Sequence, residues 1–215
     1  MSHRAVIFDL DGTLVDSAPS LHRAACAMLR GLNLPEPDLR TVTGFVGNGV
    51  PTLVDRCLDW AGGPSTDAAL ALFRQIYDAD PVTGVAIFDG VRALLADLAG
   101  RGVHLGLCTN KPTAPTETLL RKLDLGPFAA VACGDTLPVR KPHPDPLLHV
   151  IDALNVPVGD VLYVGDSVVD LQTARAAGVE YAHIALGYQN GTLTGLPQPQ
   201  VHPDIGSLSR KLLGS

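Results

Sequence analysis

The sequence predicts a doubly wound α/β fold, in which helices cover both faces of a parallel sheet, with an all-helical subdomain inserted after the first strand. Short, almost continuously apolar segments alternate with longer amphipathic ones. That alternation is typical of strands buried on both faces and joined by crossover helices. The connection between the first two strands is far longer than a usual crossover and contains only helical patterns. It therefore predicts an insertion.

The elements of the sheet are expected in regular alternation. Strands are predicted at residues 5–9, 103–108, 130–133, 161–165 and 181–185, and helices at residues 91–101, 113–123, 145–154 and 171–177. Gly102, Gly126 and Gly178 stand just after three of these helices, where a residue with positive φ commonly ends a helix. Residues 190–202 are rich in Gly, Pro and Gln and predict a surface loop before a last helix at 205–213.

The insertion is expected to form a helical cap subdomain over residues 17–83, which leaves residues 1–16 and 84–215 as the α/β core. Its predicted helices cover residues 18–30, 50–60 and 67–77. Residues 15–19 and 79–84 flank it and have the Pro, Gly and Asp content of hinges. Trp60 and Phe73 fall on apolar helical faces, so both are predicted to lie in the core of the cap.

Composition excludes several classes of protein. With 46% hydrophobic and 18% charged residues in 215, the chain is not intrinsically disordered. A net charge of −6 without clustered Lys or Arg argues against nucleic-acid binding. The four cysteines have no metal-ligand spacing, and no apolar run approaches the ~18 residues of a membrane span. The residues before the first strand leave no room for a signal peptide. We expect a soluble, cytoplasmic protein without a nucleic-acid or membrane partner.

Two aspartates follow the first predicted strand. Asp9 and Asp11 are two residues apart and therefore share a strand face, and Gly12 permits a tight turn directly after them. Ligands of open α/β sheets bind at the carboxyl ends of the strands. Because two converging carboxylates repel each other, the pair indicates a divalent metal or acid–base chemistry.

Polar residues also follow three other predicted strands. They are Thr109 and Asn110, then Lys141, and finally Asp166 with Asp170 one helical turn later. Parallel strands place these groups at one edge of the sheet. Carboxylate oxygens without imidazole or thiolate favour Mg²⁺, which accepts phosphate oxygens as further ligands. The sequence therefore predicts a magnesium-dependent phosphate site.

The segments DLDGT, CTNK, RKPHP and GDSVVD resemble, in order, the four motifs of the haloacid dehalogenase superfamily. The resemblance implies a Rossmann-like core with a helical cap. It also implies that Asp9 is a nucleophile that forms an aspartyl-phosphate and that Asp11 is the general acid–base. True dehalogenases lack the second aspartate, so Asp11 favours a phosphatase or a phosphomutase.

The same resemblance assigns the remaining groups. Mg²⁺ would be held by Asp9, the backbone carbonyl of Asp11 and the carboxylate of Asp166. The phosphate oxygens would be bound by Thr109, the Asn110 N–H and Lys141. Asp170 would orient Lys141 or a metal-bound water; alternatively, it is only a first-turn aspartate favoured by the helix dipole.

The cap is expected to contact the leaving group through Gly47, Asn48 and Gly49, whose glycines let the backbone approach a small anion. With DSAPSL, GFVGNGV, TNKP and GYQNG, the chain is similar to bacterial phosphoglycolate phosphatases. The implied substrate is a small anionic phosphomonoester, with 2-phosphoglycolate first. Tyr188, in the last of these segments, receives no role. Arg56 and His143 are expected to be solvated.

Three alternatives stay open. Related family members hydrolyse sugar phosphates or pyrophosphate. A β-phosphoglucomutase-like phosphomutase would carry a cap histidine twelve residues after the nucleophile, where this chain has Leu21, with His22 next to it. A receiver-type signalling domain also uses an acidic pocket with Thr and Lys, but it is shorter and lacks a helical insertion. The protein is expected to be a monomer or a homodimer.

Overall fold

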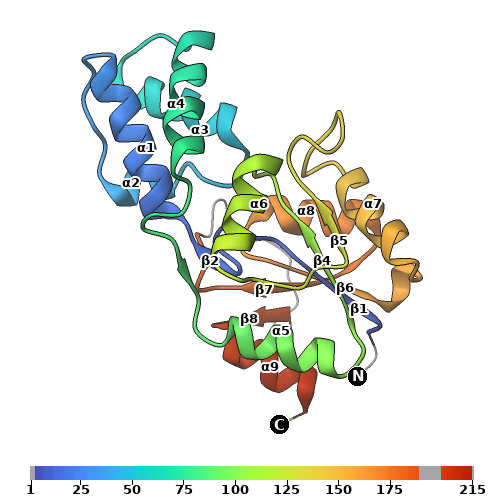
Figure 1. The fold of residues 1–215 in the computed structure, drawn as a ribbon. Helices are drawn as coiled ribbons and strands as arrows, with labels where there is room; N and C mark the ends of the chain where they lie inside the picture. The colour runs from blue at the N-terminus through green and yellow to red at the C-terminus, as the bar shows by residue number, and fades with distance from the viewer. Residues whose placement is uncertain (1–2, 189–199, 215) are drawn as a thin grey trace.

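The computed structural model describes residues 3–188 and 200–214. Within them, a six-stranded sheet has the order β5-β4-β1-β6-β7-β8, and all neighbouring strands are parallel. The strands are β1 (Ala5–Phe8), β4 (His104–Cys108), β5 (Ala130–Ala132), β6 (Val161–Gly165), β7 (Glu180–Ile184) and β8 (Val201–His202). The central strand β1 pairs with β4 and β6, so the chain segments that follow these three strands meet at one edge (Figure 1).

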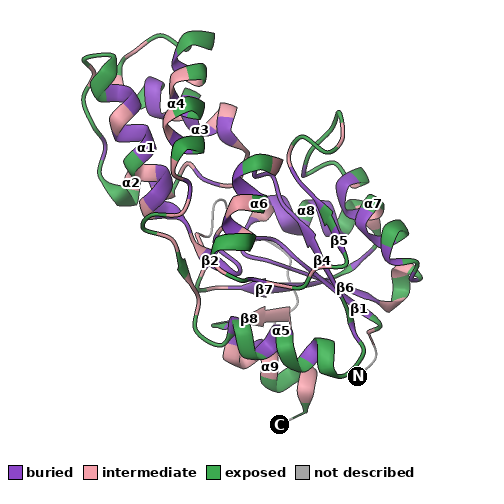
Figure 2. Cartoon of the chain, in the orientation of Figure 1, coloured by how far each residue is buried: buried purple, intermediate pink, exposed green. Residues whose placement is uncertain are grey.

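Helices cover both faces of the sheet, as predicted. The helices of the core are α5 (Val91–Gly100), α6 (Thr113–Lys122), α7 (Asp145–Leu154), α8 (Val168–Ala177) and α9 (Ile205–Leu213), and a short 3₁₀ turn covers Val158–Asp160. Side chains of β1 alternate between two hydrophobic clusters. Val6 and Phe8 pack with α5 and α9, whereas Ala5 and Ile7 pack with α7 and α8. Figure 2 shows the resulting buried layer through the strands.

The structure differs from the prediction at short elements. A two-stranded antiparallel sheet, β2 (Val15–Asp16) with β3 (Ala86–Ile87), joins the two segments at the base of the cap. Two-residue strands are too short to produce a periodic pattern. The expected loop at 190–202 lies mostly outside the described residues, and its end is β8. Helix α8 begins three residues before the predicted start because Ser167 and Asp170 form a capping box.

The cap consists of α1 (Ala18–Gly31), α2 (Leu39–Thr43), α3 (Val50–Ala61) and α4 (Asp67–Ala79). These helices bury a hydrophobic cluster of their own and form a lobe beyond the carboxyl edge of the sheet (Figure 1). Phe73 is fully buried there, but Trp60 is 47% exposed, so its predicted place in the cap core is wrong. Trp60 stands in the last turn of α3, one residue before the helix ends. The boundaries 17 and 83 stay predictions.

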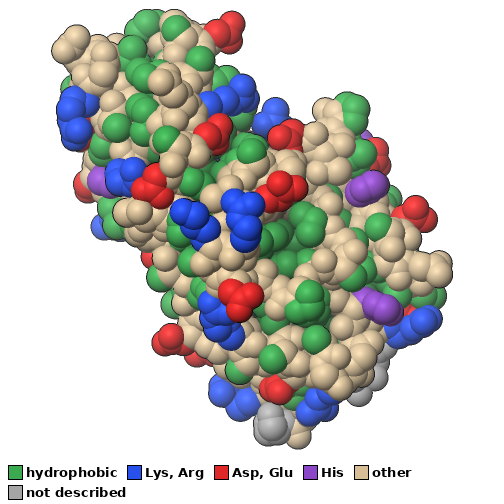
Figure 3. Space-filling view, in the orientation of Figure 1, with side chains coloured by type: hydrophobic (Ala, Val, Ile, Leu, Met, Phe, Trp, Pro, Cys, Tyr) green, Lys and Arg blue, Asp and Glu red, His purple; other side chains and the backbone are tan. Residues whose placement is uncertain are grey.

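The surface and the cysteines agree with an ordinary globular chain. The four cysteines are free and buried. Acidic and basic side chains are interspersed over both lobes on the face shown in Figure 3. In the part of the chain that the structure describes, no helix combines the length and the apolar character needed to cross a bilayer.

Candidate active site

Asp9 stands at the carboxyl end of β1, with its backbone N–H bonded to the Val164 carbonyl at 2.8 Å. This bond extends the β1–β6 pairing and holds the Asp9 side chain at the edge of the sheet. Gly12 then turns the chain with φ +88°, a conformation that favours glycine. A Cβ on Gly12 would lie 2.3 Å from Oδ2 of Asp166, so the turn also makes room for that carboxylate.

Lys141 joins Asp9 to Asp170. Its Nζ is 2.9 Å from Asp9 Oδ1 and 2.7 Å from Asp170 Oδ1. Asp170 also accepts hydrogen bonds from the Tyr163 hydroxyl at 2.7 Å and from the Ser167 hydroxyl at 2.5 Å. The oxygens of Asp170 are therefore engaged by its neighbours. Asp170 completes the capping box of α8 and also bonds to Lys141, so it contacts both the helix start and the lysine.

Asp166 follows β6 and faces Asp9 across the site. Its Oδ1 accepts from the Thr13 hydroxyl at 2.9 Å, and its Oδ2 accepts from the Tyr188 N–H at 2.7 Å. Gly187 packs so closely that a Cβ there would lie 2.2 Å from Cβ of Asp166. Glycines at positions 12 and 187 thus form a cradle that fixes this carboxylate.

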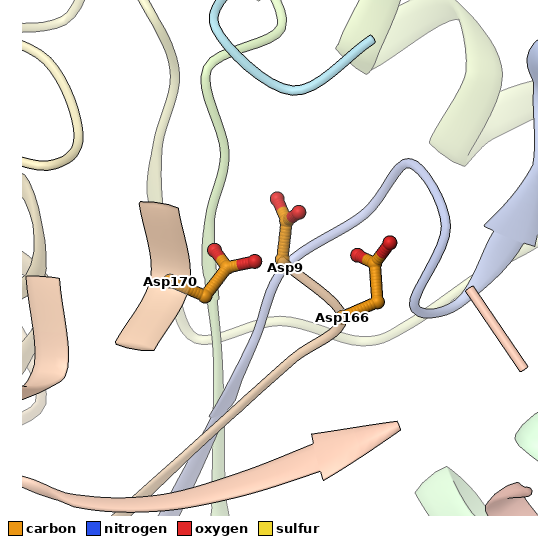
Figure 4. Close-up of side chains that lie close together, drawn as sticks. All are labelled: Asp9, Asp166 and Asp170. Atoms are coloured by element: carbon orange, nitrogen blue, oxygen red, sulfur yellow. The ribbon is translucent and has the colours of Figure 1, made fainter. Parts of the chain in front are cut away.

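The carboxylates of Asp9, Asp166 and Asp170 converge, with one oxygen of each within 4.8 Å of the others (Figure 4). Burial raises the pKa of Asp9 to about 7, against the opposing charge of Lys141, and raises the pKa of Asp166 well above its ordinary value. Burial would also raise the pKa of Asp170, but Lys141 and its hydrogen-bond donors hold it below its ordinary value. A cation between Asp9 and Asp166 would therefore relieve the repulsion between their carboxylates, and this set of oxygen donors fits Mg²⁺.

Lys141 is itself buried, with a side chain that is 2% exposed. Burial alone would lower its pKa, but Asp170 and Asp9 raise it above the ordinary value. A fixed positive charge thus stands beside Asp9, where it can attract the oxygens of a phosphate.

Asp11 lies apart from the three converging carboxylates. Its Oδ1 accepts from the Ser17 hydroxyl at 2.5 Å, and the ammonium of Lys111 contacts both of its oxygens, at 2.9 and 3.2 Å. The side chain of Asp11 is therefore held at the pocket and turned to Lys111. The predicted metal contact through the Asp11 backbone carbonyl stays a prediction.

Thr109 and Asn110 follow β4 at the same edge. The Thr109 hydroxyl accepts from the Lys111 N–H at 3.2 Å, which leaves its own hydrogen to donate. The Asn110 side chain donates to the carbonyls of Gly47 and Lys141, both at 3.0 Å. Asn110 thereby ties the cap loop to the core.

A pocket lies between these groups and the cap. Its lining includes Asp9, Asp11, Thr109, Asn110, Lys111 and, from the cap, Leu21, Val46, Gly47, Gly49, Val50, Leu53 and Tyr77. The predicted loop residues Gly47 and Gly49 are thus at the pocket. Asn48 is not among the described residues that line it.

Lys111, Tyr77 and Tyr188 belong to this region although no site role was predicted for them. Lys111 is the last residue of the recognised CTNK segment and could have been found there. Tyr77 and Tyr188 come from the cap and from the loop after β7, so only the folded chain brings them to the site. Arg56 is not fully solvated, since it donates to the Phe45 carbonyl at 3.1 Å, whereas His143 is exposed as expected.

Comparisons with known proteins agree with the geometry. The sequence model of the haloacid dehalogenase-like hydrolases matches residues 3–178. A phosphoglycolate phosphatase of Rhodospirillum rubrum is 42% identical over 214 residues, covering 95% of this chain and 89% of the relative. One of Escherichia coli is 38% identical over 220 residues, covering 92% of this chain and 87% of the relative.

Solved structures show the same likeness. The crystal structure of a predicted phosphoglycolate phosphatase from Haemophilus somnus superimposes with a TM-score of 0.87 at 27% identity, covering 99% of this chain and 98% of the other. The family match spans the converging carboxylates, Lys141 and the cap. The chain therefore belongs to the haloacid dehalogenase-like hydrolases.

Proposed function

We propose that the chain is a Mg²⁺-dependent phosphatase that forms an aspartyl-phosphate on Asp9 and converts 2-phosphoglycolate into glycolate and phosphate. The observation that carries the proposal is the pairing of Asp9 with Lys141 at 2.9 Å, beside Asp166, where Asp9 lines the pocket under the cap. Relatives named phosphoglycolate phosphatase, 38% to 42% identical over nearly the whole chain, support the substrate.

The metal would be held by Asp9, Asp166 and the backbone carbonyl of Asp11. When bound, Mg²⁺ would supply positive charge between the carboxylates and the incoming phosphate oxygens. Lys141, the Thr109 hydroxyl and the Asn110 N–H would bind those oxygens and orient phosphorus toward Asp9. Asp170 acts through Lys141, whose ammonium it holds.

Two proton transfers complete the reaction. Asp9 attacks phosphorus, the bond from phosphorus to the leaving oxygen breaks, and Asp11 gives its proton to that oxygen. Asp11 then takes a proton from the water that attacks the phosphorus of the aspartyl-phosphate, which frees Asp9 and phosphate. The Ser17 hydroxyl and Lys111 keep the Asp11 carboxylate at the pocket for both steps.

The cap supports hydrolysis rather than phosphomutase chemistry. A mutase needs a cap acid–base, but Leu21 occupies the corresponding pocket position. Nε2 of His22 lies 2.9 Å from the Pro37 carbonyl, within the cap. Gly47 and Gly49, with Asn48 between them, would contact the leaving group. Free cysteines suit a reducing cytoplasm, and the proposal includes a monomer or homodimer there.

Phosphate release tests the proposal. The panel should include 2-phosphoglycolate, sugar phosphates and pyrophosphate, each with Mg²⁺, and compare kcat/KM. We expect 2-phosphoglycolate to be preferred by at least about tenfold. Asp9→Asn should abolish turnover, whereas the exposed Asp152→Asn on α7 should not change it.

Removal of Mg²⁺ with a chelator should stop turnover, and added Mg²⁺ should restore it. Turnover by the Asp9→Asn variant would contradict Asp9 as the nucleophile. Turnover in the presence of the chelator would contradict the need for Mg²⁺. If kcat/KM is highest for a sugar phosphate or for pyrophosphate, the proposed substrate is wrong, but the assignment as a phosphatase stands.

A further inference from the structure

The pocket becomes apolar away from Asp9. Four cap residues on its wall are aliphatic: Leu21, Val46, Val50 and Leu53. Sugar hydroxyls buried against this wall would lack hydrogen-bond partners, at about 1–3 kcal/mol for each unpaired group. The wall therefore favours a leaving group with few hydroxyls.

Lys111 is the one positively charged side chain among the described residues that line the pocket. Its side chain is 2% exposed, and Nζ donates to both oxygens of Asp11. The carboxylate of Asp11 pairs with this ammonium at 2.9 Å, which keeps a positive charge at the pocket wall. An ammonium has three N–H donors. The contacts with Asp11 use at most two of them.

Tyr77 adds a second donor from the cap. Its ring centre lies 5.1 Å from Lys111 Nζ, and its side chain is 1% exposed. Its hydroxyl has no hydrogen-bond partner in the described part of the chain. Such a buried hydroxyl costs about 1–3 kcal/mol, which a ligand oxygen in the pocket would offset. Phe73 stacks on the ring with centroids 5.6 Å apart, which holds the hydroxyl in position.

We propose that Lys111 and Tyr77 form a subsite for a carboxylate on the leaving group, and this subsite rests on the hydrolysis proposed above. In 2-phosphoglycolate one carbon separates the leaving oxygen from the carboxylate carbon. When Asp11 bonds the leaving oxygen, the carboxylate falls next to Asp11, where Lys111 Nζ lies 2.9 Å from Oδ1. One donor comes from the core and the other from the cap, so the subsite exists only when the cap covers the core.

Two substrates that differ at one group test the subsite. They are 2-phosphoglycolate and 2-hydroxyethyl phosphate, which has a neutral alcohol in place of the carboxylate. We expect Tyr77→Phe to lower kcat/KM for 2-phosphoglycolate about tenfold, and Lys111→Met about a hundredfold, as one neutral and one charged hydrogen bond are lost. For 2-hydroxyethyl phosphate, Tyr77→Phe should change kcat/KM by at most about threefold. Lys111→Met also releases Asp11, so it should slow both substrates, but 2-phosphoglycolate by a further factor of about ten or more. Arg74→Gln removes an exposed cation from α4, the helix that carries Tyr77. It should leave the ratio of the two kcat/KM values unchanged.

Equal losses on the two substrates would overturn the subsite, because Lys111 and Tyr77 would then serve Asp11 or the cap fold. A wild-type enzyme that hydrolyses both substrates equally well would overturn the subsite and leave the proposed hydrolysis intact. Release of phosphate from neither substrate would overturn the hydrolysis and the subsite together. If Lys111→Met does not fold, Tyr77→Phe, which keeps the stacked ring, decides the question by itself.

Discussion

Asp170 shows how one side chain serves both a helix and the candidate site. One of its oxygens bonds Lys141 and Tyr163, and the other bonds the Ser167 hydroxyl and N–H at the start of α8. The capping box therefore fixes the carboxylate that positions the lysine. A buried ammonium is tolerated here because two carboxylates, Asp170 and Asp9, lie within 3 Å of it.

Replacing Asp170 by Asn should destabilise the fold and slow the reaction. Removing one partner of a buried ion pair costs about 3–5 kcal/mol, and we expect about 3 kcal/mol because Asp9 remains. Urea unfolding would measure this loss, with kcat/KM measured in parallel. Asp145→Asn is the matched control, since Asp145 is an exposed first-turn aspartate of α7. Equal effects of the two substitutions would reduce Asp170 to a helix-dipole residue, worth about 0.3–1 kcal/mol.

At the scale of elements, the hinge before α1 is held by a residue from another part of the chain. Helix α1 begins directly after Ser17, whose hydroxyl donates to Asp11 and so does not cap the helix. The Tyr188 hydroxyl takes that place, accepting from the N–H groups of Ser17 at 2.7 Å and Ala18 at 2.8 Å. It also donates to Asp16 at 2.9 Å. A residue of the core loop thus caps the first helix of the other lobe.

Tyr188→Phe should loosen the start of α1. The ring would remain packed, but the Ser17 N–H would lose its acceptor and the Ala18 N–H would keep only Asp16 Oδ1, at 3.2 Å. We expect a cost of about 1 kcal/mol, as for an ordinary N-cap. In hydrogen exchange, the amides of Ser17 and Ala18 should exchange about fivefold faster. The amides in the first turn of α7 should keep their rate. Unchanged protection at residues 17 and 18 would show that water or another group caps α1.

At the scale of the whole molecule, two hydrophobic clusters lie on the faces of the sheet and a third holds the cap together. The last two strands of the sheet bury two histidines. His183 on β7 and His202 on β8 are 1% and 4% exposed. Burial lowers the pKa of both below the ordinary 6.5. In each case the unfolded chain binds a proton more readily than the folded chain.

The stability that His183 contributes should therefore depend on pH. A histidine with a lowered folded-state pKa contributes fully above 6.5, and this contribution is lost as pH falls through the lowered value. The difference in free energy of unfolding between the wild type and His183→Phe should grow from pH 5 to pH 7.5. Asp9 and Asp166, whose pKa values are raised, change the free energy of unfolding with pH in the opposite direction. They are present in both proteins, so their effect cancels in the difference. The exposed His149→Gln should give a constant difference; a constant difference for His183→Phe as well would refute the prediction.

The sequence by itself determined the alternation of strands and helices, the helical insertion and the candidate residues at the strand ends. The period of the apolar residues reports local structure, and residues that follow parallel strands must meet at one edge. Asp9, Thr109, Lys141 and Asp166 could therefore be predicted to lie together. Their chemical roles came from the resemblance to a family and are still proposals.

The tertiary structure decided what depends on contacts between distant segments. The two-residue strands β2 and β3 have no periodic pattern, and each exists only because the other pairs with it. Lys111 meets Tyr77 of the cap, and Tyr188 meets Ser17, across 34 and 171 positions of sequence. The exposure of Trp60 was decided by how the cap helices pack. Local patterns state which face of an element is apolar; only packing decides which surface that face meets.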